Sequence, residues 1–499
     1  MKNIVLAIFM AATAPAWALT VTVTQPGTVK SAVQAAGSDL QTVTELTVSG
    51  PVNAADLFTL GNEATSLTTL DLSATTIAAY DGETLQGSKV YAADLIPNGA
   101  FAGTKLQTVV LPATGSLTIG DMAFAQSALT ALPAMTNVTT LGNAAFSGCT
   151  SLTAIDYPAG VTATGDYLFA GCTALKTVNT GAASAVAPHA FDSCTALTDV
   201  TGSENLQNVG TAAFYGCSAL HNFNFGNQLA SVGAYAFAES GIEGADLQHS
   251  SRLATVGDFA FANCPALASI HFAGNSAPAL GQGVFFDDKA LTSIQLPEGI
   301  TALPAYSFKG TDKLALDTIP DGIAVVDEYA LKDNATSYIA LPTSLTRLGD
   351  GAMENMTNLE TIRATRVTAV PELGKDVWRG VDQKNVRLDV RPGLQSGFSN
   401  ADQWCEFALN VTTEDDGITA DGIGQTRIRA RFVGSDLLLD TPGANMTLVD
   451  VYDTAGTLVA QSSPAADYAV VSTASASTPF FIVVVTLDNG TSTTLKLKR

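Results

Sequence analysis

The chain has 499 residues, of which 46% are hydrophobic and 14% charged, with 46 acidic against 24 basic side chains. This composition is typical of a folded chain and argues against disorder. A formal net charge of −22 without a basic stripe argues against nucleic-acid binding, which needs Lys and Arg opposite phosphates, and equally against binding to an anionic membrane surface.

Residues 1–18 resemble a cleaved secretory signal peptide. Lys2 precedes an apolar run, Ile4 to Ala14, and small residues follow at Ala16 and Ala18. The alternative is a membrane anchor, but the run stops at Pro15, short of the roughly 20 apolar residues that a spanning helix needs. We therefore expect an exported mature chain without a transmembrane helix, at the cell surface or outside the cell, with the periplasm as the alternative location.

Residues 19–94 carry strand patterns that differ from the units after them. LTVTVTQ alternates apolar and polar residues, and TELTVSG and SLTTLDLS place leucine and valine in strand-like positions. A solenoid needs atypical terminal units to cover its exposed apolar end. We expect this segment to form the N-terminal cap and the leading repeats.

Residues 95–392 form an internal repeat. An aromatic slot recurs at intervals of 22 to 25 residues, and Leu331, Met353 and Trp378 fill it in the last units. A period in the low twenties indicates a leucine-rich solenoid, so we predict a right-handed superhelix with a parallel sheet and one continuous core. The phenylalanines of the slot form the predicted structural spine: Phe101, Phe124, Phe146, Phe169, Phe191, Phe214, Phe237, Phe261, Phe285 and Phe308.

Each unit has a turn, G-x-x-A-F-x-x-C, a strand, L-x-x-I-x-L-P, and a short V/I-x-x-V/I segment that leads to the next turn. In the strand, apolar residues point inward and the intervening ones outward. Because stacked strands lie about 4.8 Å apart, the thirteen units of the array predict a parallel sheet roughly 60 Å long.

The slot three residues after each spine position mostly holds small side chains that can form hydrogen bonds. Five of the six cysteines occupy it: Cys149, Cys172, Cys194, Cys217 and Cys264. Tight turns leave buried backbone groups that need partners, and we expect this slot to supply them. The cysteines are then buried thiols, the alternatives being one or two disulfides between neighbouring rungs or a metal site.

The last part of the chain changes character. Residues 393–411 are predicted to form the C-terminal cap, with a short helix from Asn400 to Phe407 that places Trp404 over the last rung. Residues 412–425 are acidic and glycine-rich and read as a linker, because the closing Glu of a calcium loop is missing. Residues 426–499 alternate as short strands and predict a small antiparallel β-sandwich.

The repeat G-x-x-A-F-x-G-C-x-x-L-x-x-I-x-L-P resembles that of BspA-like leucine-rich repeat proteins of bacterial surfaces. The best matches are Gly142 to Pro158 and Gly257 to Phe272, and the resemblance runs from about Leu40 to Val411. It implies a cell-surface or secreted protein that binds host matrix proteins, host cells or other bacteria. Such an implication is an analogy of fold and does not identify a ligand.

The C-terminal segment resembles the sorting domain of the type IX secretion system. VDVYDTAGTLV, from Val449 to Val459, matches its strand–turn–strand pattern, and TTLKLKR matches its basic end. The chain departs from that family at Pro479 to Val483, where Gly followed by Tyr-Ile-Val is common. The resemblance implies an export address, and the alternative is a β-sandwich without that role.

The sequence shows no catalytic constellation. The four histidines, His189, His221, His249 and His271, lie in four different units, whereas metal sites and Ser-His-Asp sites need convergent side chains. No G-x-S-x-G, H-E-x-x-H or phosphate-loop motif occurs. We therefore predict neither an enzyme nor a cofactor.

The outward row of the predicted sheet is the candidate binding face. It is polar and poor in the aromatic residues and arginines that dominate protein interfaces, so it is either a solvated sheet face or a broad surface of weak contacts. Its candidate members are Asp156, Asn179, Asn224, Asp246, His271, Gln295 and Arg363.

Together these features predict a monomeric, exported, non-enzymatic surface protein. Its expected partners, by family resemblance, are host matrix or cell-surface proteins or other bacterial surfaces. One alternative is a carbohydrate-binding accessory protein, which would need a line of aromatic residues that the outward row lacks. Others are a structural spacer without a ligand, and a hydrolase, which the scattered histidines disfavour.

Overall fold

The structure, a computed structural model, describes residues 18–84, 87–158, 160–161, 163–273, 277–297, 299–412, 420–421, 427–433, 435–441, 445–473, 480–488 and 492–498. The expected signal peptide, apart from Ala18, and most of the expected linker lie outside the described residues. The chain divides into two compact units, one of residues up to Asp389 with Leu394–Asn410, the other of Val390–Gly393 with the residues from Val411 onward.

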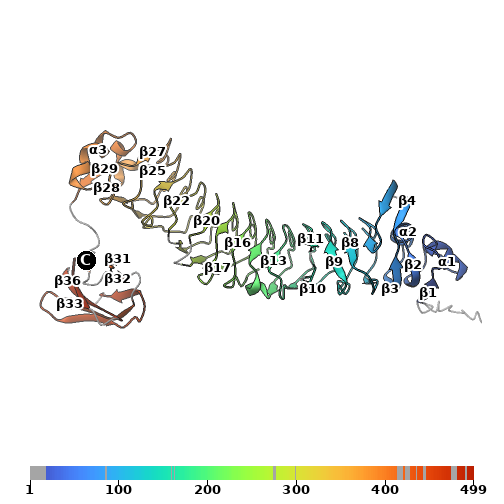
Figure 1. Cartoon of the computed structure of the whole chain (residues 1–499). Helices are drawn as coiled ribbons and strands as arrows, with labels where there is room; N and C mark the ends of the chain where they lie inside the picture. The colour runs from blue at the N-terminus through green and yellow to red at the C-terminus, as the bar shows by residue number, and fades with distance from the viewer. Residues whose placement is uncertain are drawn as a thin grey trace, which may run out of the picture. The chain divides into compact units, whose positions relative to one another are not determined.

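The first unit is a parallel β-solenoid of about 16 turns, as predicted, and its rungs follow one another in chain order in Figure 1. Where the predicted strand of a unit forms, it lies in a first row. This row contains β1 (Leu19–Thr22), β2 (Glu45–Val52), β3 (Thr69–Ile77), β7 (Thr108–Val110), β10 (Ala154–Asp156), β12 (Thr177–Asn179), β14 (Asp199–Thr201), β17 (Gly244–Leu247), β19 (Ser269–Phe272), β21 (Ser293–Gln295), β24 (Tyr338–Ala340), β26 (Thr361–Ala364), β28 (Arg387–Val390) and β29 (Ala408–Val411).

The V/I-x-x-V/I segments, expected only as connections, form a second row of parallel strands. They are β6 (Leu95–Ile96), β8 (Leu117–Ile119), β9 (Val138–Leu141), β11 (Ala163–Thr164), β13 (Ala185–Val186), β15 (Asn208–Val209), β16 (Ser231–Val232), β18 (Thr255–Val256), β20 (Ala279–Leu280), β22 (Ala302–Leu303), β23 (Val325–Val326), β25 (Arg347–Leu348) and β27 (Glu372–Leu373). Coils that contribute a strand to each row therefore have strands on two sides of the core.

The first row is not the single long sheet that the repeat predicts. It divides into the sheets β1-β2-β3-β7, β10-β12-β14, β17-β19-β21 and β24-β26-β28-β29. The rung between β7 and β10 carries Pro133 in the strand segment, and proline has no N–H for the ladder. In the rung between β14 and β17, Phe223 occupies the inward position that Val200 and Ala245 fill in the neighbouring rungs. Those two residues are buried, but the larger Phe223 ring is only half-buried.

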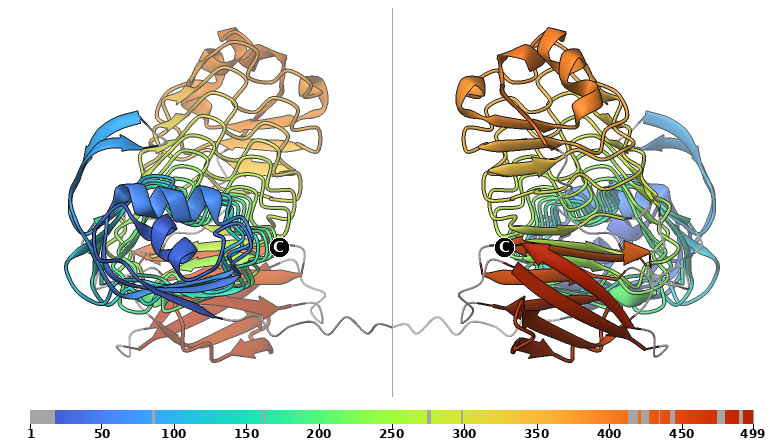
Figure 2. Two further views of the ribbon diagram at one scale, coloured as in Figure 1. Left: turned by 90° about the vertical axis from the view of Figure 1, so that its right-hand side faces the viewer. Right: turned by 90° about the vertical axis from the view of Figure 1, so that its left-hand side faces the viewer.

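The N-terminal turns add helices that the sequence patterns did not predict. The helices α1 (Val29–Ala35) and α2 (Ala54–Glu63) lie at the N-terminal end of the stack (Figure 2, left), and β4 (Tyr80–Thr84) pairs with β5 (Gly87–Tyr91) as an antiparallel hairpin. The buried Asp56 joins these turns, because its carboxylate accepts hydrogen bonds from the backbone N–H of Gly27 (2.6 Å) and Val29 (2.8 Å).

The ten spine phenylalanines are at most 1% exposed. Successive rings stack with centroids 5.3–6.1 Å apart and with planes within 26° of parallel. Each ring is therefore covered by the rings of its neighbouring rungs, which is how units that cannot bury an apolar face alone share one core.

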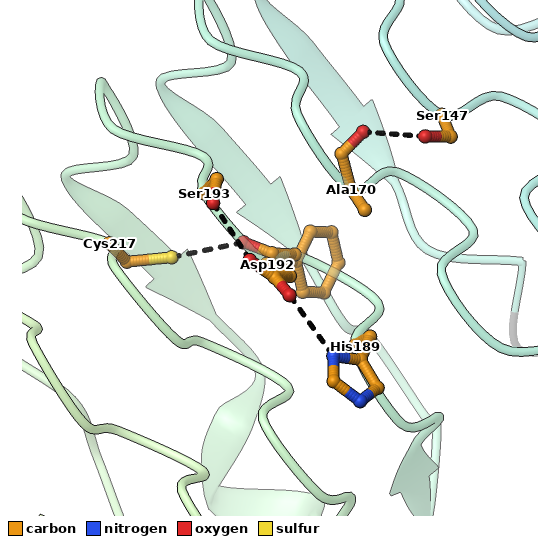
Figure 3. A network of polar contacts seen from close by, with 7 residues as sticks. Ser147, Ala170, His189, Asp192, Ser193 and Cys217 are labelled. Carbon is orange, nitrogen blue, oxygen red and sulfur yellow. Dashed lines mark hydrogen bonds and ion pairs between the residues drawn. The ribbon is translucent and has the colours of Figure 1, made fainter.

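The cysteine slot bonds one rung to the next. In five rungs the thiol donates to the carbonyl of the spine phenylalanine in the preceding rung, as Cys217 does to Phe191 (3.2 Å; Figure 3). Desolvation by burial raises the pKa of these thiols. All six cysteines are free, with only Cys405 exposed, so the structure contains the thiols of the first alternative and no disulfide.

Asp288 is the one carboxylic acid in this slot, and it is fully buried. Its Oδ1 accepts a hydrogen bond from the Cys264 N–H (2.7 Å), while its Oδ2 has no partner. Desolvation raises the pKa of Asp288 well above the usual range of a carboxyl group. The neutral acid therefore occupies a position that a thiol or a hydroxyl fills in most other rungs.

The C-terminal cap differs from the prediction. The expected helix from Asn400 to Phe407 is wrong, because the helix α3 spans Gln395–Asn400 and only a 3-10 turn, η4 (Trp404–Glu406), follows it. Trp404 nevertheless packs 5.2 Å from the Trp378 ring and donates from Nε1 to the Pro371 carbonyl (3.0 Å). Further 3-10 turns are η1 (Ser203–Asn205), η2 (Gln383–Asn385) and η3 (Pro392–Leu394).

The second unit is antiparallel, as predicted. Its sheets are ordered β30-β31-β32-β35 and β34-β33-β36-β37, and residues of both sheets share one apolar core, with Leu437 and Leu439 from the first sheet and Val449 and Val483 from the second. The strands are β30 (Ala420–Asp421), β31 (Arg427–Val433), β32 (Asp436–Asp440), β33 (Met446–Asp453), β34 (Leu458–Ser462), β35 (Tyr468–Ser472), β36 (Phe480–Leu487) and β37 (Ser492–Lys498).

Replacing a spine ring should destabilise the solenoid strongly. We expect Phe169→Ala to lower the free energy of unfolding by about 3–5 kcal/mol, because it leaves a cavity between two stacked rings. Denaturant unfolding followed by circular dichroism measures this loss. The control is Tyr167→Ala in the same turn, where the side chain is 43% exposed and the expected loss is much smaller. Equal losses in the two variants would contradict a buried spine.

The buried Asp288 should make stability depend on pH. The raised pKa means that the folded chain keeps this proton while the unfolded chain releases it near pH 3.9, so Asp288 lowers stability progressively as the pH rises above about 3.9. Asp288→Asn should raise the melting temperature at pH 7 and change it less at pH 4. The control is Asp287→Asn at the neighbouring, solvent-accessible position. An Asp288→Asn variant less stable than the wild type at pH 7 would contradict the burial of a neutral acid.

Candidate functional site

The structure places the predicted outward row in register on the first row of strands. Asp156 pairs with Asn179 across β10 and β12, and Asp246, His271 and Gln295 are paired in order across β17, β19 and β21. Asn224 belongs to the rung of the sheet break. His271 is half-buried and the other five of these side chains are exposed.

Arg363 is the exception in this row. It pairs with Ala340 in register, but its side chain is only 5% exposed, so the expectation that it projects into solvent is wrong. Its Nε donates a hydrogen bond to Thr365 Oγ1 (3.2 Å).

The row lines two hollows of the sheet face. The smaller, of about 260 Å³, contains Asp156 and Asn179. The larger, of about 580 Å³, lies at the sheet break between β14 and β17 and is called the sheet-break groove. Its lining residues are Thr198, Asp199, Val200, Thr201, Asn222, Phe223, Asn224, Gly244, Ala245, Asp246, Ser269 and His271. Gln295 and Arg363 lie outside both hollows.

Local hydrogen bonds fix several side chains of the row. Asn179 donates from Nδ2 to Asp156 Oδ1 (2.9 Å). Asn224 Oδ1 accepts from the Gly226 N–H (3.1 Å), and Asp246 Oδ1 accepts from the N–H two residues further on (3.1 Å). Each of these side chains keeps at least one polar atom that these bonds do not use.

A second surface, missed by the sequence reasoning, runs along the turns. The residue two positions before each spine residue has a left-handed backbone, with φ between 51° and 66°. Several of these residues are large and form, with their neighbours Phe286 and Lys309, what we call the aromatic ridge: Met122, Tyr167, His189, Tyr235, Phe259, Tyr306 and Tyr329. The repeat alignment contains this column and could have revealed it.

The left-handed backbone of the ridge disfavours the large side chains that it carries. A left-handed conformation costs a bulky residue roughly 1–2 kcal/mol, and glycine occupies the same column at Gly99, Gly283 and Gly351. The other left-handed position of each turn, two residues after the spine, holds only Gly, Asn, Asp, Gln, Glu or Ser. The geometry of the turn therefore does not account for aromatic residues at the position two residues before the spine.

The ridge is an array of contacting rings and cations. Tyr167 stacks on His189 with centroids 4.1 Å apart, and Tyr235 stacks on Phe259 at 5.3 Å. Further along, Lys309 Nζ lies 5.2–5.8 Å from the rings of Phe286, Tyr306 and Tyr329. Exposure reaches 51% at Met122 and 43% at both Tyr167 and Tyr235.

A Ser, His and Asp cluster occurs on this ridge, but it lacks the connectivity of a nucleophilic triad. Asp192 accepts hydrogen bonds from both partners, with His189 Nδ1 at 3.0 Å and Ser193 Oγ at 2.8 Å (Figure 3). In a triad the base lies between the hydroxyl and the acid. Here the carboxylate occupies that middle position, so the serine hydroxyl has no adjacent base.

Another hollow, of about 770 Å³, lies where the cap meets the last rung. Gln403 accepts from the Val377 N–H (3.0 Å) and donates to the Gly374 carbonyl (2.8 Å). These groups hold the cap in place. Over the described part of the chain, no helix is long and apolar enough to cross a membrane, and no group of His, Cys, Asp or Glu side chains has a metal-binding arrangement.

Comparison with solved structures finds the same fold in a protein from Bacteroides ovatus. A leucine-rich repeat protein from Bacteroides ovatus is 18% identical, with a TM-score of 0.50 over 75% of this chain and 85% of that one. A leucine-rich cell surface protein from Faecalibacterium prausnitzii is 19% identical (TM-score 0.30; 59% and 86% covered), and a leucine-rich repeat protein from Eubacterium ventriosum 17% (0.37; 69% and 84%). No curated protein matches the chain.

The family comparison covers the solenoid. The model of the BspA type leucine-rich repeat region matches residues 94–185, 184–285 and 278–387, which together make up more than half of the chain. These are the residues whose spine, thiol slot and strand rows recur from rung to rung. The protein therefore belongs to the family of BspA type leucine-rich repeat proteins.

Proposed function

We propose that the protein is an exported, non-enzymatic surface protein whose solenoid binds proteins of the host matrix, of host cells or of other bacteria. The observation that carries the proposal is the aromatic ridge, where large side chains remain in a backbone conformation that favours glycine. A structural spacer would have no use for side chains that destabilise its own turns.

The ridge has the composition of a protein-binding surface. Tyrosine, phenylalanine and methionine are enriched in interfaces, and tyrosine offers a large contact area with few rotatable bonds. Stacking holds these rings in place before any partner arrives: Tyr167 on His189, and Tyr235 on Phe259. Such preorganisation reduces the side-chain entropy lost on binding. The row on the sheet face, from Asp156 to Gln295, remains a second, more polar candidate surface.

The non-enzymatic role is supported by the arrangement of the side chains that could have acted as catalytic nucleophiles or bases. The Ser193 hydroxyl bonds to the Asp192 carboxylate, and His189 is stacked beneath Tyr167. The thiols of the ladder are buried, and their raised pKa disfavours the reactive thiolate. Neither set resembles an activated nucleophile.

Export and surface location rest on both ends of the sequence. Residues 1–18 have the pattern of a signal peptide. The strand–turn–strand segment Val449 to Val459, which resembles the type IX sorting domain, forms β33 and β34, joined by a turn in which Asp453 Oδ1 accepts from the N–H groups of Ala455 and Thr457. We propose that the second unit serves as the export address.

Loss of ridge rings should weaken partner binding without unfolding the chain. We expect Tyr235→Asn with Tyr306→Asn to lower affinity for the partner about tenfold or more, because interface tyrosines commonly contribute over 1 kcal/mol each. Asn tolerates the left-handed backbone, so stability should be kept. Surface plasmon resonance against immobilised host matrix proteins and whole bacterial cells measures the loss.

The matched control is Ala144→Asn, at the same left-handed position in a rung where alanine replaces the aromatic side chain. This variant should bind like the wild type. Undiminished binding by the double tyrosine variant would remove the ridge from the proposal. If the wild-type protein bound none of these surfaces saturably, a protein-binding role would be wrong.

Deletion of residues 426–499 should abolish arrival at the cell surface in the native host, with the solenoid retained inside the cell envelope. Cell fractionation and surface labelling follow its location. A full-length variant with Asp453→Ala removes a hydrogen-bond acceptor in the β33–β34 turn. It alters the segment that resembles the sorting domain and keeps the rest of the second unit in the chain. Normal surface display of the deleted chain would contradict a sorting role.

A further inference from the structure

The sheet-break groove has features that protein binding along the ridge does not use. It opens where the strand ladder stops after β14 and resumes at β17, so the rung that carries Asn222, Phe223 and Asn224 is not a strand. Its volume, about 580 Å³, is within the range of pockets for small ligands. No residue of the aromatic ridge lines it.

One aromatic ring faces this groove from a fixed position. Phe223 packs edge-on against the spine rings of Phe214 (5.2 Å) and Phe237 (4.8 Å) and is tilted against Phe225 (4.9 Å). It is half-buried and lines the groove. Three buried rings therefore support an apolar surface in an otherwise polar sheet face.

The rim around Phe223 offers donors and acceptors with fixed directions. Asn224 Oδ1 is held by the Gly226 N–H, which directs the Nδ2 donors elsewhere. Asp246 Oδ1 and Asp199 Oδ2 already accept internal hydrogen bonds, which leaves the second oxygen of each carboxylate as an acceptor. His271 adds an imidazole at the far side.

The charge of the groove restricts the class of ligand. No lysine or arginine lines it, while Asp199 and Asp246 do. Phosphate, sulfate and carboxylate groups would be repelled there. A ligand with adjacent hydroxyl groups matches the carboxylate and carboxamide groups of the rim, because each hydroxyl can both donate and accept a hydrogen bond. The C–H face of a sugar ring matches the aromatic surface of Phe223.

We propose that the sheet-break groove is a binding site for a neutral saccharide, with Phe223 as the apolar support and Asn224, Asp246 and His271 as hydrogen-bonding groups. This inference is independent of protein binding by the ridge, since the two surfaces share no residue. Loss of the groove would leave protein binding by the ridge unchanged, and loss of the ridge rings would leave saccharide binding unchanged.

Calorimetric titration of the full mature chain with a panel of neutral oligosaccharides, and with their uronic-acid and sulfated counterparts, tests the proposal. The expected result is saturable binding of at least one neutral oligosaccharide, unaffected by salt, and no binding of the charged ones. Asp246→Ala and Asn224→Ala, both at exposed side chains, should each weaken it about tenfold or more, because they leave sugar hydroxyls unpaired.

The matched control is Gln295→Ala, which lies in the same row of exposed side chains but outside the groove. It and the double tyrosine variant of the ridge should bind the saccharide like the wild type. Phe223→Leu, which keeps an apolar side chain against the spine, should also weaken binding, with the melting temperature as a check on folding. Binding of none of the neutral oligosaccharides, salt-sensitive binding of a basic peptide alone, or equal affinities for wild type and Asp246→Ala would each overturn the proposal.

Discussion

The contact between neighbouring rungs is the interaction on which the rest of this molecule depends. A single coil has too little interior to bury its own apolar side chains, so each spine phenylalanine from Phe124 to Phe285 is covered by the rings before and after it. Polar contacts repeat at the same boundary, where the thiols of Cys172 and Cys194 each donate to the spine carbonyl of the rung before. The same interface between rungs therefore buries the apolar rings and provides hydrogen bonds to the backbone carbonyls.

The same turn that builds this core also determines what the outside displays. Each turn contains two left-handed residues, and at the one before the spine the large side chains of Met122, Tyr167 and Tyr235 are exposed. A feature placed there recurs at the spacing of the rungs, which is how the neighbouring Tyr306 and Tyr329 rings come to lie 5.6 and 5.8 Å from Lys309 Nζ. Because the rungs repeat, one residue position in each rung forms an extended surface along the solenoid.

Departures from the repeat distinguish this chain from a uniform solenoid. Pro133 and Phe223 interrupt the strand ladder, and the second interruption opens a hollow with polar groups on its rim. Asp288 is an acid where most other rungs have a thiol or a hydroxyl. Its second carboxyl oxygen has no hydrogen-bond partner, and its burial lowers stability as the pH rises. Natural proteins retain such locally unfavourable choices mainly where function or strain demands them.

The amino-acid sequence by itself determined the solenoid, the spine and the register of the outward row, because a fixed period identifies which residues are equivalent. Equivalence, however, does not state how a side chain leaves the backbone. Only the tertiary structure showed that Arg363 is buried, that the cap helix ends at Asn400, and that Tyr235 is exposed from a left-handed turn. These outcomes depend on local dihedral angles and on whether the strands of neighbouring rungs pair. Packing between rungs, rather than the sequence of a single rung, decides both.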